Sequence, residues 1–87
     1  MRLADMAALL RNANVPDWFY VLDGGLGTGE CVGIEPTGAD WSVYYSERGR
    51  KTPLERCADE DAACRAMLRH IDRMMRDSGR GALPQVP

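Results

Sequence analysis

The chain has few of the residues that metal sites and catalytic thiols require. Its 87 residues contain one histidine and three cysteines, and no two cysteines are spaced as C-x-x-C. Zinc needs about four such ligands held together, and a Cys–His hydrolase needs a thiolate beside an imidazole. Cys64 and His70 would point in different directions from one helix. We therefore expect no metal, no cofactor and no enzymatic activity, although Cys31 as a nucleophile and hydrolysis by paired carboxylates stay open.

Long apolar runs and a cationic leader are also absent from the sequence. No stretch approaches the roughly 20 apolar residues that cross a bilayer, and no basic segment precedes an apolar run near the first residue. An odd number of cysteines does not suit a secreted disulfide framework, whereas reduced thiols pack as small hydrophobes. The sequence therefore predicts a cytoplasmic protein with free cysteines and no membrane contact.

The composition that remains is that of a folded domain. Hydrophobic residues make up 45% of the chain and charged residues 28%, as in ordinary globular proteins. A chain of this length suits one hydrophobic core and is too short for two. We expect a single α+β domain over residues 1–78 and a flexible C-terminal tail over residues 79–87.

Helical spacing of apolar residues occurs at both ends of the chain. It predicts a first helix over residues 3–13, which stops before Pro16. A longer apolar stripe predicts a second helix, capped by Asp59 at its start. Ser78 and Gly79 end this helix, because glycine readily takes the left-handed conformation that follows a helix.

The middle of the chain alternates between strand patterns and turn residues. Aromatic, β-branched or alternating side chains predict strands over residues 18–22, 30–35, 41–46 and 52–57. Pro53 makes the last of these an edge strand or an extended arm. The glycine-rich segment 23–29 is predicted as a hairpin loop rather than a phosphate cradle, because its glycines lead into a strand instead of a helix.

The order of these elements predicts an α+β fold: an antiparallel three- to four-stranded meander flanked by an N-terminal and a C-terminal helix, both packed on one face. Connections this short form hairpins rather than parallel crossovers. Trp41 and Leu68 are expected in the core. Alternation places Tyr44 on the opposite face, which we expect to meet solvent. Which side of the first strand is buried stays open, so either Trp18 and Tyr20 or Phe19 can reach that open face.

Charge is distributed unevenly along the chain. Residues 1–47 contain seven carboxylates and two arginines, whereas residues 48–87 contain nine basic residues and six carboxylates. Such a layout favours steering toward a charged partner. Arginines at helical spacing along one flank of the second helix could contact nucleic acid: Arg65, Arg69, Arg73 and Arg76. The sequence pI of about 5.3 argues against that interpretation.

Residues 20–71 resemble small bacterial immunity proteins that accompany polymorphic or contact-dependent toxins. The similar segments are W-S-V-Y-Y-S-E-R-G at residues 41–49 and D-E-D-A-A-C-R-A-M-L at residues 59–68, preceded by a strand loop that contains glycine. The resemblance implies a non-enzymatic inhibitor that binds the active site or an essential surface of a toxin. Acidic side chains could then imitate phosphates in a basic substrate groove.

The sequence hypothesis is therefore an immunity protein that neutralises a bacterial toxin domain by direct protein–protein binding in the cytosol. Partner-binding residues are expected on the open sheet face and its adjoining turns: Tyr44, Glu35, Glu47, Arg48, Asp23 and Glu30. The alternatives are a small nucleic-acid-associated regulator that uses the arginine flank, and a subunit of a housekeeping enzyme. The toxin and the oligomeric state stay open.

Overall fold

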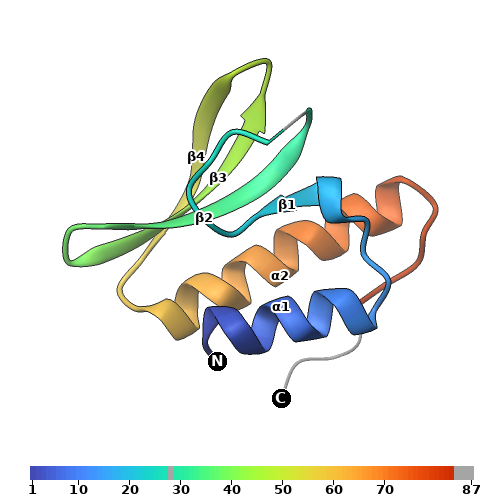
Figure 1. Cartoon of the computed structure of the whole chain (residues 1–87), viewed down its shortest axis with the longest axis horizontal. Helices are drawn as coiled ribbons and strands as arrows, with labels where there is room; N and C mark the ends of the chain where they lie inside the picture. Colours follow the sequence, from blue (N-terminus) through green and yellow to red (C-terminus); the bar gives the residue numbers. More distant parts are fainter. Residues whose placement is uncertain (28, 84–87) are drawn as a thin grey trace.

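Two helices lie on one side of a four-stranded sheet in the computed structural model of the chain (Figure 1), which describes residues 1–27 and 29–83. The sheet is mostly antiparallel with one parallel pair, so the fold is α+β as predicted. The elements follow in the order α1 (Leu3–Asn12), the 3-10 helix η1 (Asp17–Phe19), β1 (Tyr20–Val21), β2 (Cys31–Thr37), β3 (Asp40–Glu47), β4 (Arg50–Cys57) and α2 (Glu60–Asp77).

Both helices begin and end close to the predicted positions. The Asp59 carboxylate accepts a hydrogen bond from the Ala62 N–H at 2.8 Å, which satisfies one free donor at the start of α2. Gly79, at φ +76°, follows the last turn of α2 in the left-handed conformation. Asn14, at φ 58°, ends the first helical segment in a similar way.

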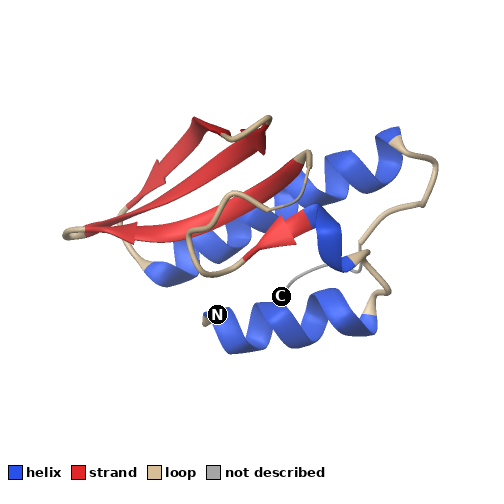
Figure 2. Cartoon of the chain, turned by 45° about the horizontal axis from the view of Figure 1, so that its top comes forward, coloured by secondary structure: helices blue, strands red, loops and turns tan. Residues whose placement is uncertain are grey.

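The core lies between α2 and the sheet face that it covers. The apolar stripe of α2 contributes Leu68, which is buried as predicted, and β2 and β3 contribute Ile34 and Val43. Trp41, also expected in the core, is half-buried and packs against its edge. α1 covers the other side of α2, and Figure 2 shows both helices on the same face of the sheet.

Strands β2, β3 and β4 form the predicted meander. The β3–β4 connection has two residues with positive φ, Arg48 at 52° and Gly49 at 76°, as tight hairpin turns require. β4 lies at the edge of the sheet, where Pro53 can be accommodated without losing a ladder hydrogen bond on the solvent side. The pairing shifts register between Val43 and Tyr44, next to that proline.

The prediction for the first strand was wrong in length and direction. Residues 17–19 form a 3-10 helix, and only Tyr20 and Val21 form β1, which pairs parallel to β2. To pair two strands in parallel, the connecting segment must run back over the length of the first strand before the second begins. This distance is short here, because the two residues of β1 span only about 7 Å. The segment between Val21 and Cys31 is long enough for that return, so the glycines serve a crossover instead of a hairpin.

Part of the expected tail is described and part is not. The Leu83 N–H donates to the Asp72 carboxylate at 2.7 Å, and the Leu83 side chain packs against the core. Residues 84–87 of the predicted tail and Thr28 of the predicted glycine loop lie outside the described residues.

Candidate functional site

The glycine-rich segment covers the sheet face opposite the helices. We call residues 23–29 the glycine loop. Three consecutive carbonyls of this loop accept hydrogen bonds from side chains of β3 and β4. Lys51 Nζ donates to the Gly24 oxygen at 2.6 Å, Tyr44 Oη donates to the Gly25 oxygen at 2.6 Å, and Ser46 Oγ donates to the Leu26 oxygen at 2.5 Å. The glycine loop is therefore held against the sheet by side chains of the neighbouring strands and not by groups of the loop itself.

Close packing beneath the loop depends on two glycines. A Cβ at Gly33 would lie 2.1 Å from the Tyr44 ring, and a Cβ at Gly27 would lie 2.7 Å from the Cys31 sulfur. Tyr44 is 1% exposed. It does point away from the core as the strand alternation predicts, but the expectation that this face meets solvent was wrong here. The glycine loop lies over it, because side-chain donors on the sheet can satisfy the loop carbonyls.

Burial also controls the ionisation of the groups beneath the loop. Burial, and then the nearby charges of Glu35, Cys31 and Asp23, raise the pKa of Tyr44 to about 12. Burial raises the pKa of the Cys31 thiol, although a hydrogen bond with Ser46 acts in the opposite direction. A raised pKa keeps the thiol protonated at neutral pH, and a protonated thiol is a poor nucleophile.

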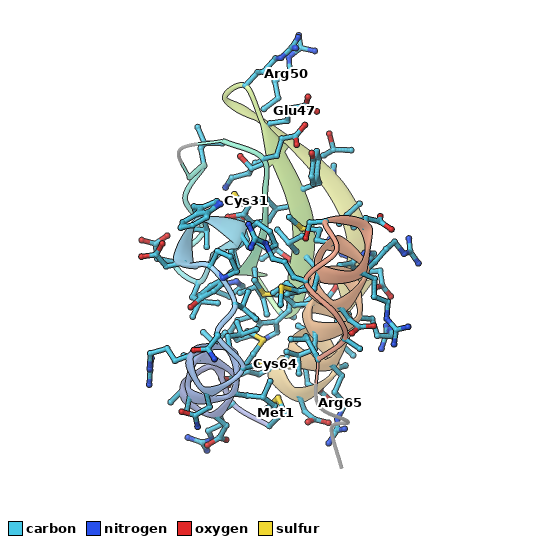
Figure 3. The ribbon with its side chains drawn as sticks, turned by 90° about the vertical axis from the view of Figure 1, so that its right-hand side faces the viewer. Met1, Cys31, Glu47, Arg50, Cys64 and Arg65 are labelled. Atoms are coloured by element: carbon cyan, nitrogen blue, oxygen red, sulfur yellow. The ribbon has the colours of Figure 1, made fainter. Side chains whose placement is uncertain are left out.

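The other two cysteines lie in similarly apolar surroundings. Burial, followed by the charge of Glu60, raises the pKa of Cys64 to about 11, and burial raises that of Cys57. Cys31 and Cys64 are in different parts of the molecule (Figure 3). Across residues 1–27 and 29–83, no three histidine, cysteine, aspartate or glutamate side chains gather as a potential metal site.

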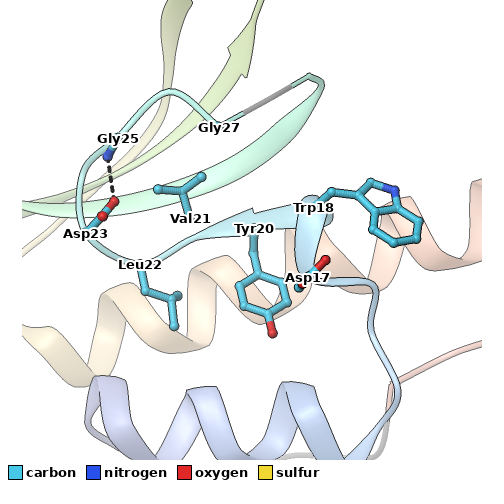
Figure 4. Close-up of a pocket in the computed structure, with 8 residues that line it drawn as sticks. All are labelled: Asp17, Trp18, Tyr20, Val21, Leu22, Asp23, Gly25 and Gly27. Carbon is cyan, nitrogen blue, oxygen red and sulfur yellow. Dashed lines mark hydrogen bonds between the residues drawn. The ribbon is translucent and has the colours of Figure 1, made fainter.

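A hollow of about 600 Å³ lies beside β1 (Figure 4). Its lining residues come from η1, β1 and the glycine loop: Asp17, Trp18, Tyr20, Val21, Leu22, Asp23, Gly25 and Gly27. In Figure 4, the side chains of Tyr20 and Leu22 point toward α1, whereas the Trp18 ring extends from η1 in a different direction, away from α1. Trp18 is 58% exposed, the largest value among the exposed large hydrophobic residues of the described chain.

A second hollow, of about 320 Å³, lies between the glycine loop and the β3–β4 hairpin. Its lining includes Leu26, which is 42% exposed, together with Glu30, Glu47 and Arg48. Burial, and then the carboxylates of Glu30 and Glu47, raise the pKa of Tyr45, so both carboxylates act on one hydroxyl. Gly27 lines both hollows, so the two hollows flank the same loop.

The carboxylates around this loop differ from those elsewhere in the chain. Five carboxylates elsewhere in the chain each form an ion pair with a basic side chain: Glu35–Lys51, Asp40–Arg56, Glu55–Arg69, Asp61–Arg65 and Asp72–Arg76. Three more accept backbone N–H groups at helix starts: Asp5, Asp59 and Glu60. Among the described residues, four of the remaining carboxylates have no cationic partner and line the two hollows: Asp17, Asp23, Glu30 and Glu47. We define the acidic loop surface as these four carboxylates together with Trp18 and Leu26.

The structure divides the six predicted partner-binding residues. Four of them lie around the glycine loop: Asp23, Glu30, Glu47 and Arg48. Glu35 instead forms an ion pair with Lys51 at 2.8 Å, and Tyr44 is buried beneath the loop. Sequence reasoning did not select Asp17, Trp18 or Leu26. One sequence signal could have indicated Asp17 and Trp18. An aromatic residue there directly follows a carboxylate, and the predicted strand that begins at Trp18 is apolar on both sides, so one of its apolar sides had to be exposed.

The arginine flank of α2 is largely engaged within the molecule. Arg69 pairs with Glu55 at 3.1 Å and Arg76 with Asp72 at 2.9 Å. Arg65 pairs with Asp61, and His70 also contacts Glu55 at 2.8 Å. The flank therefore alternates in charge along its length instead of forming a continuous basic strip.

Glu47 and Arg50 lie near the tip of the β3–β4 hairpin, at the opposite end of the molecule from Met1 and Arg65 (Figure 3). In the described part of the chain, no helix combines the length and the apolar character needed to cross a membrane. No protein-family model matches the chain, and no curated protein or solved structure is significantly similar to it. The resemblance to immunity proteins therefore rests on the sequence segments alone.

Proposed function

We propose that the chain is a protein-binding inhibitor of the immunity-protein type, which neutralises a bacterial toxin domain in the cytosol through its acidic loop surface. The observation that carries this proposal is the setting of Trp18 and Leu26. Both side chains are exposed apolar groups, and each shares a hollow with two carboxylates that have no cationic partner in the described chain. This combination of apolar centre and acidic rim suits a partner with a basic surface.

The anchoring of the glycine loop supports the same function. Ordering a flexible loop during association lowers affinity, so a loop that is already fixed binds with a smaller entropic loss. The contacts from Tyr44, Ser46 and Lys51 hold the loop backbone in place without a partner. Leu26 is thereby presented between the two hollows on a fixed backbone. The buried residues Tyr44 and Ser46 contribute to binding through the loop rather than by contact.

The nucleic-acid alternative has less support. Three of the four flank arginines have carboxylate partners, and Arg73 alone has none among the described residues. A phosphate backbone would also meet repulsion from the acidic loop surface. The direct comparison is retention on a nucleic-acid column at low salt, where we expect the chain to elute without delay.

The proposal predicts that a gene next to this one encodes a toxin domain, and that domain provides the test. That domain is expressed alone and together with the chain, and growth and complex formation by size-exclusion chromatography are measured. We expect the chain to restore growth and to form a stable complex. Growth arrest that persists at a high level of the folded chain, with no complex, would contradict the toxin assignment.

Matched truncations separate the acidic loop surface from other exposed apolar positions. Trp18→Ala and Leu26→Ala should each weaken complex formation by about 2 kcal/mol if they act as anchors. Leu54→Ala is the control, because Leu54 is 38% exposed but lies on β4, at the edge of the sheet opposite to β1. Equal losses for all three variants would show that the complex forms elsewhere.

A further inference from the structure

Three aromatic rings of the chain differ in their cationic neighbours. Arg80 lies over the Phe19 ring, 5.3 Å from its centroid, and Lys51 lies over the Tyr44 ring at 4.7 Å. Trp18 has no such cation in the described part of the chain; its ring contact is the edge of Phe19, at 6.3 Å between centroids. Indole binds cations more strongly than the other aromatic side chains. The most favourable ring is therefore the one left exposed to solvent.

The carboxylates near Trp18 make the same position favourable for a cation. Asp17 precedes Trp18 in η1, is exposed and has no cationic partner among the described residues. Asp23 lines the other end of the hollow, and none of the described residues that line it is basic. Val21 and Leu22 are apolar residues that also line the hollow, and their side chains point to opposite sides of β1 (Figure 4). A long cationic side chain could thus place its aliphatic stem on the apolar lining and its charge near Trp18 and Asp17.

We propose that this hollow binds an arginine side chain of the protein partner, with its guanidinium between the Trp18 ring and the Asp17 carboxylate. Arginine fits better than lysine, because a planar guanidinium stacks on an aromatic face while its N–H groups contact a carboxylate. Asp23 contributes attraction from the far end without contact. The inference rests on the proposed function for the kind of partner, but its chemistry can be measured without one.

The test uses the full chain and a short peptide, Ac-Gly-Arg-Gly-NH2, with nuclear magnetic resonance of the two indole N–H groups. Matched peptides replace arginine by citrulline, which keeps the shape without the charge, or by lysine. We expect the arginine peptide to shift the Trp18 indole signal saturably and to leave the Trp41 signal in place. The lysine peptide should bind about threefold more weakly, and the citrulline peptide about tenfold more weakly.

Variants assign the effect to the proposed residues. Trp18→Ala lacks the indole reporter, so its binding is followed by the backbone amide signals of Val21 and Leu22, and saturable binding should be abolished. Asp17→Asn should weaken binding about threefold, as for an exposed ion pair. Asp77→Asn is the control, because Asp77 is an exposed carboxylate at the end of α2 without a partner in the described chain. Thermal unfolding confirms that each variant is folded. Citrulline or lysine peptides that bind as tightly as arginine, or an unchanged affinity in Asp17→Asn, would overturn the inference.

The outcome is separable from the toxin experiment. If the toxin domain is not neutralised but the arginine peptide binds as expected, the arginine site stands and the immunity function falls. If neutralisation succeeds but the Trp18 signal does not respond to the arginine peptide, the function stands and the arginine site is wrong.

Discussion

Gly33 and Tyr44 lie directly opposite each other on neighbouring strands, and their sizes are matched. The tyrosine ring occupies the volume that any larger residue at position 33 would need. The ring in turn carries the hydroxyl that holds Gly25 of the glycine loop. A single missing Cβ thus allows a buried aromatic residue to support the acidic loop surface from below.

The first prediction concerns this missing Cβ. Gly33→Ala should lower the free energy of unfolding by about 2 kcal/mol or more, because the new Cβ overpacks the Tyr44 ring. Gly29→Ala is the control, since a Cβ there meets no atom of the described residues within 4 Å, and it should change stability by less than about 1 kcal/mol. Urea unfolding measures both. Equal stabilities of the two variants would show that the ring moves aside at little cost.

The second prediction concerns the Tyr44 hydroxyl and pH. Its pKa is about 12 in the folded chain, above the ordinary value of 10.0. The folded state therefore holds this proton more tightly than the unfolded state, so the stabilisation is complete below pH 10 and is lost as the pH rises toward 12. Unfolding free energies between pH 9 and 12 should fall more steeply for the parent than for Tyr44→Phe. Parallel pH profiles would contradict the raised pKa.

At the scale of elements, the sequence predicted the positions of helices and strands well wherever a local sequence pattern determines them. Apolar spacing and stop residues fixed both helices, and Asp59 marked the start of α2. Alternation with turn residues fixed β2, β3 and β4 within a few residues. The segment from residue 17 to residue 30 was not predictable in the same way. Its glycines fit a hairpin loop, but the observed crossover depends on donors from Tyr44, Ser46 and Lys51, which are distant in sequence. The same contacts explain why Tyr44 could not be recognised as buried.

The third prediction tests whether Lys51 holds the glycine loop. Lys51→Met keeps an apolar stem but removes the donor to the Gly24 oxygen and the ion pair with Glu35. Amide hydrogen exchange of residues 22–27 should accelerate about threefold, while that of α2 stays unchanged. Arg50→Met is the control, since Arg50 is an exposed neighbour without a partner in the described chain. If both variants exchange alike, the Lys51 contacts do not restrain the loop.

At the scale of the whole molecule, the excess of carboxylates in residues 1–47 is concentrated in one region, around the glycine loop. The sequence showed the excess of carboxylates, but it could not show which of them have partners. Glu35 and Asp40 pair with basic residues of β4, whereas Asp17 and Glu47 remain beside the two hollows. Four of the six predicted binding residues therefore lie around the loop, and their role in binding stays a prediction. The exposed apolar side chains of Trp18 and Leu26 emerged only from the folded arrangement.

The last prediction separates local charge from net charge in association with the partner. Asp17→Lys and Asp77→Lys change the net charge of the chain equally, but only Asp17 lies in the acidic loop surface. Steering by charge acts over about a Debye length, roughly 10 Å at 0.1 M salt, so position should matter more than total charge. Stopped-flow association with the proposed toxin partner should slow about tenfold for Asp17→Lys at low salt and converge with the parent at about 0.5 M salt. Asp77→Lys should associate like the parent throughout, and Trp18→Ala should act mainly by raising the dissociation rate. Equal slowing by both charge reversals would mean that the partner senses only the overall charge, and the acidic loop surface would then lose its electrostatic role.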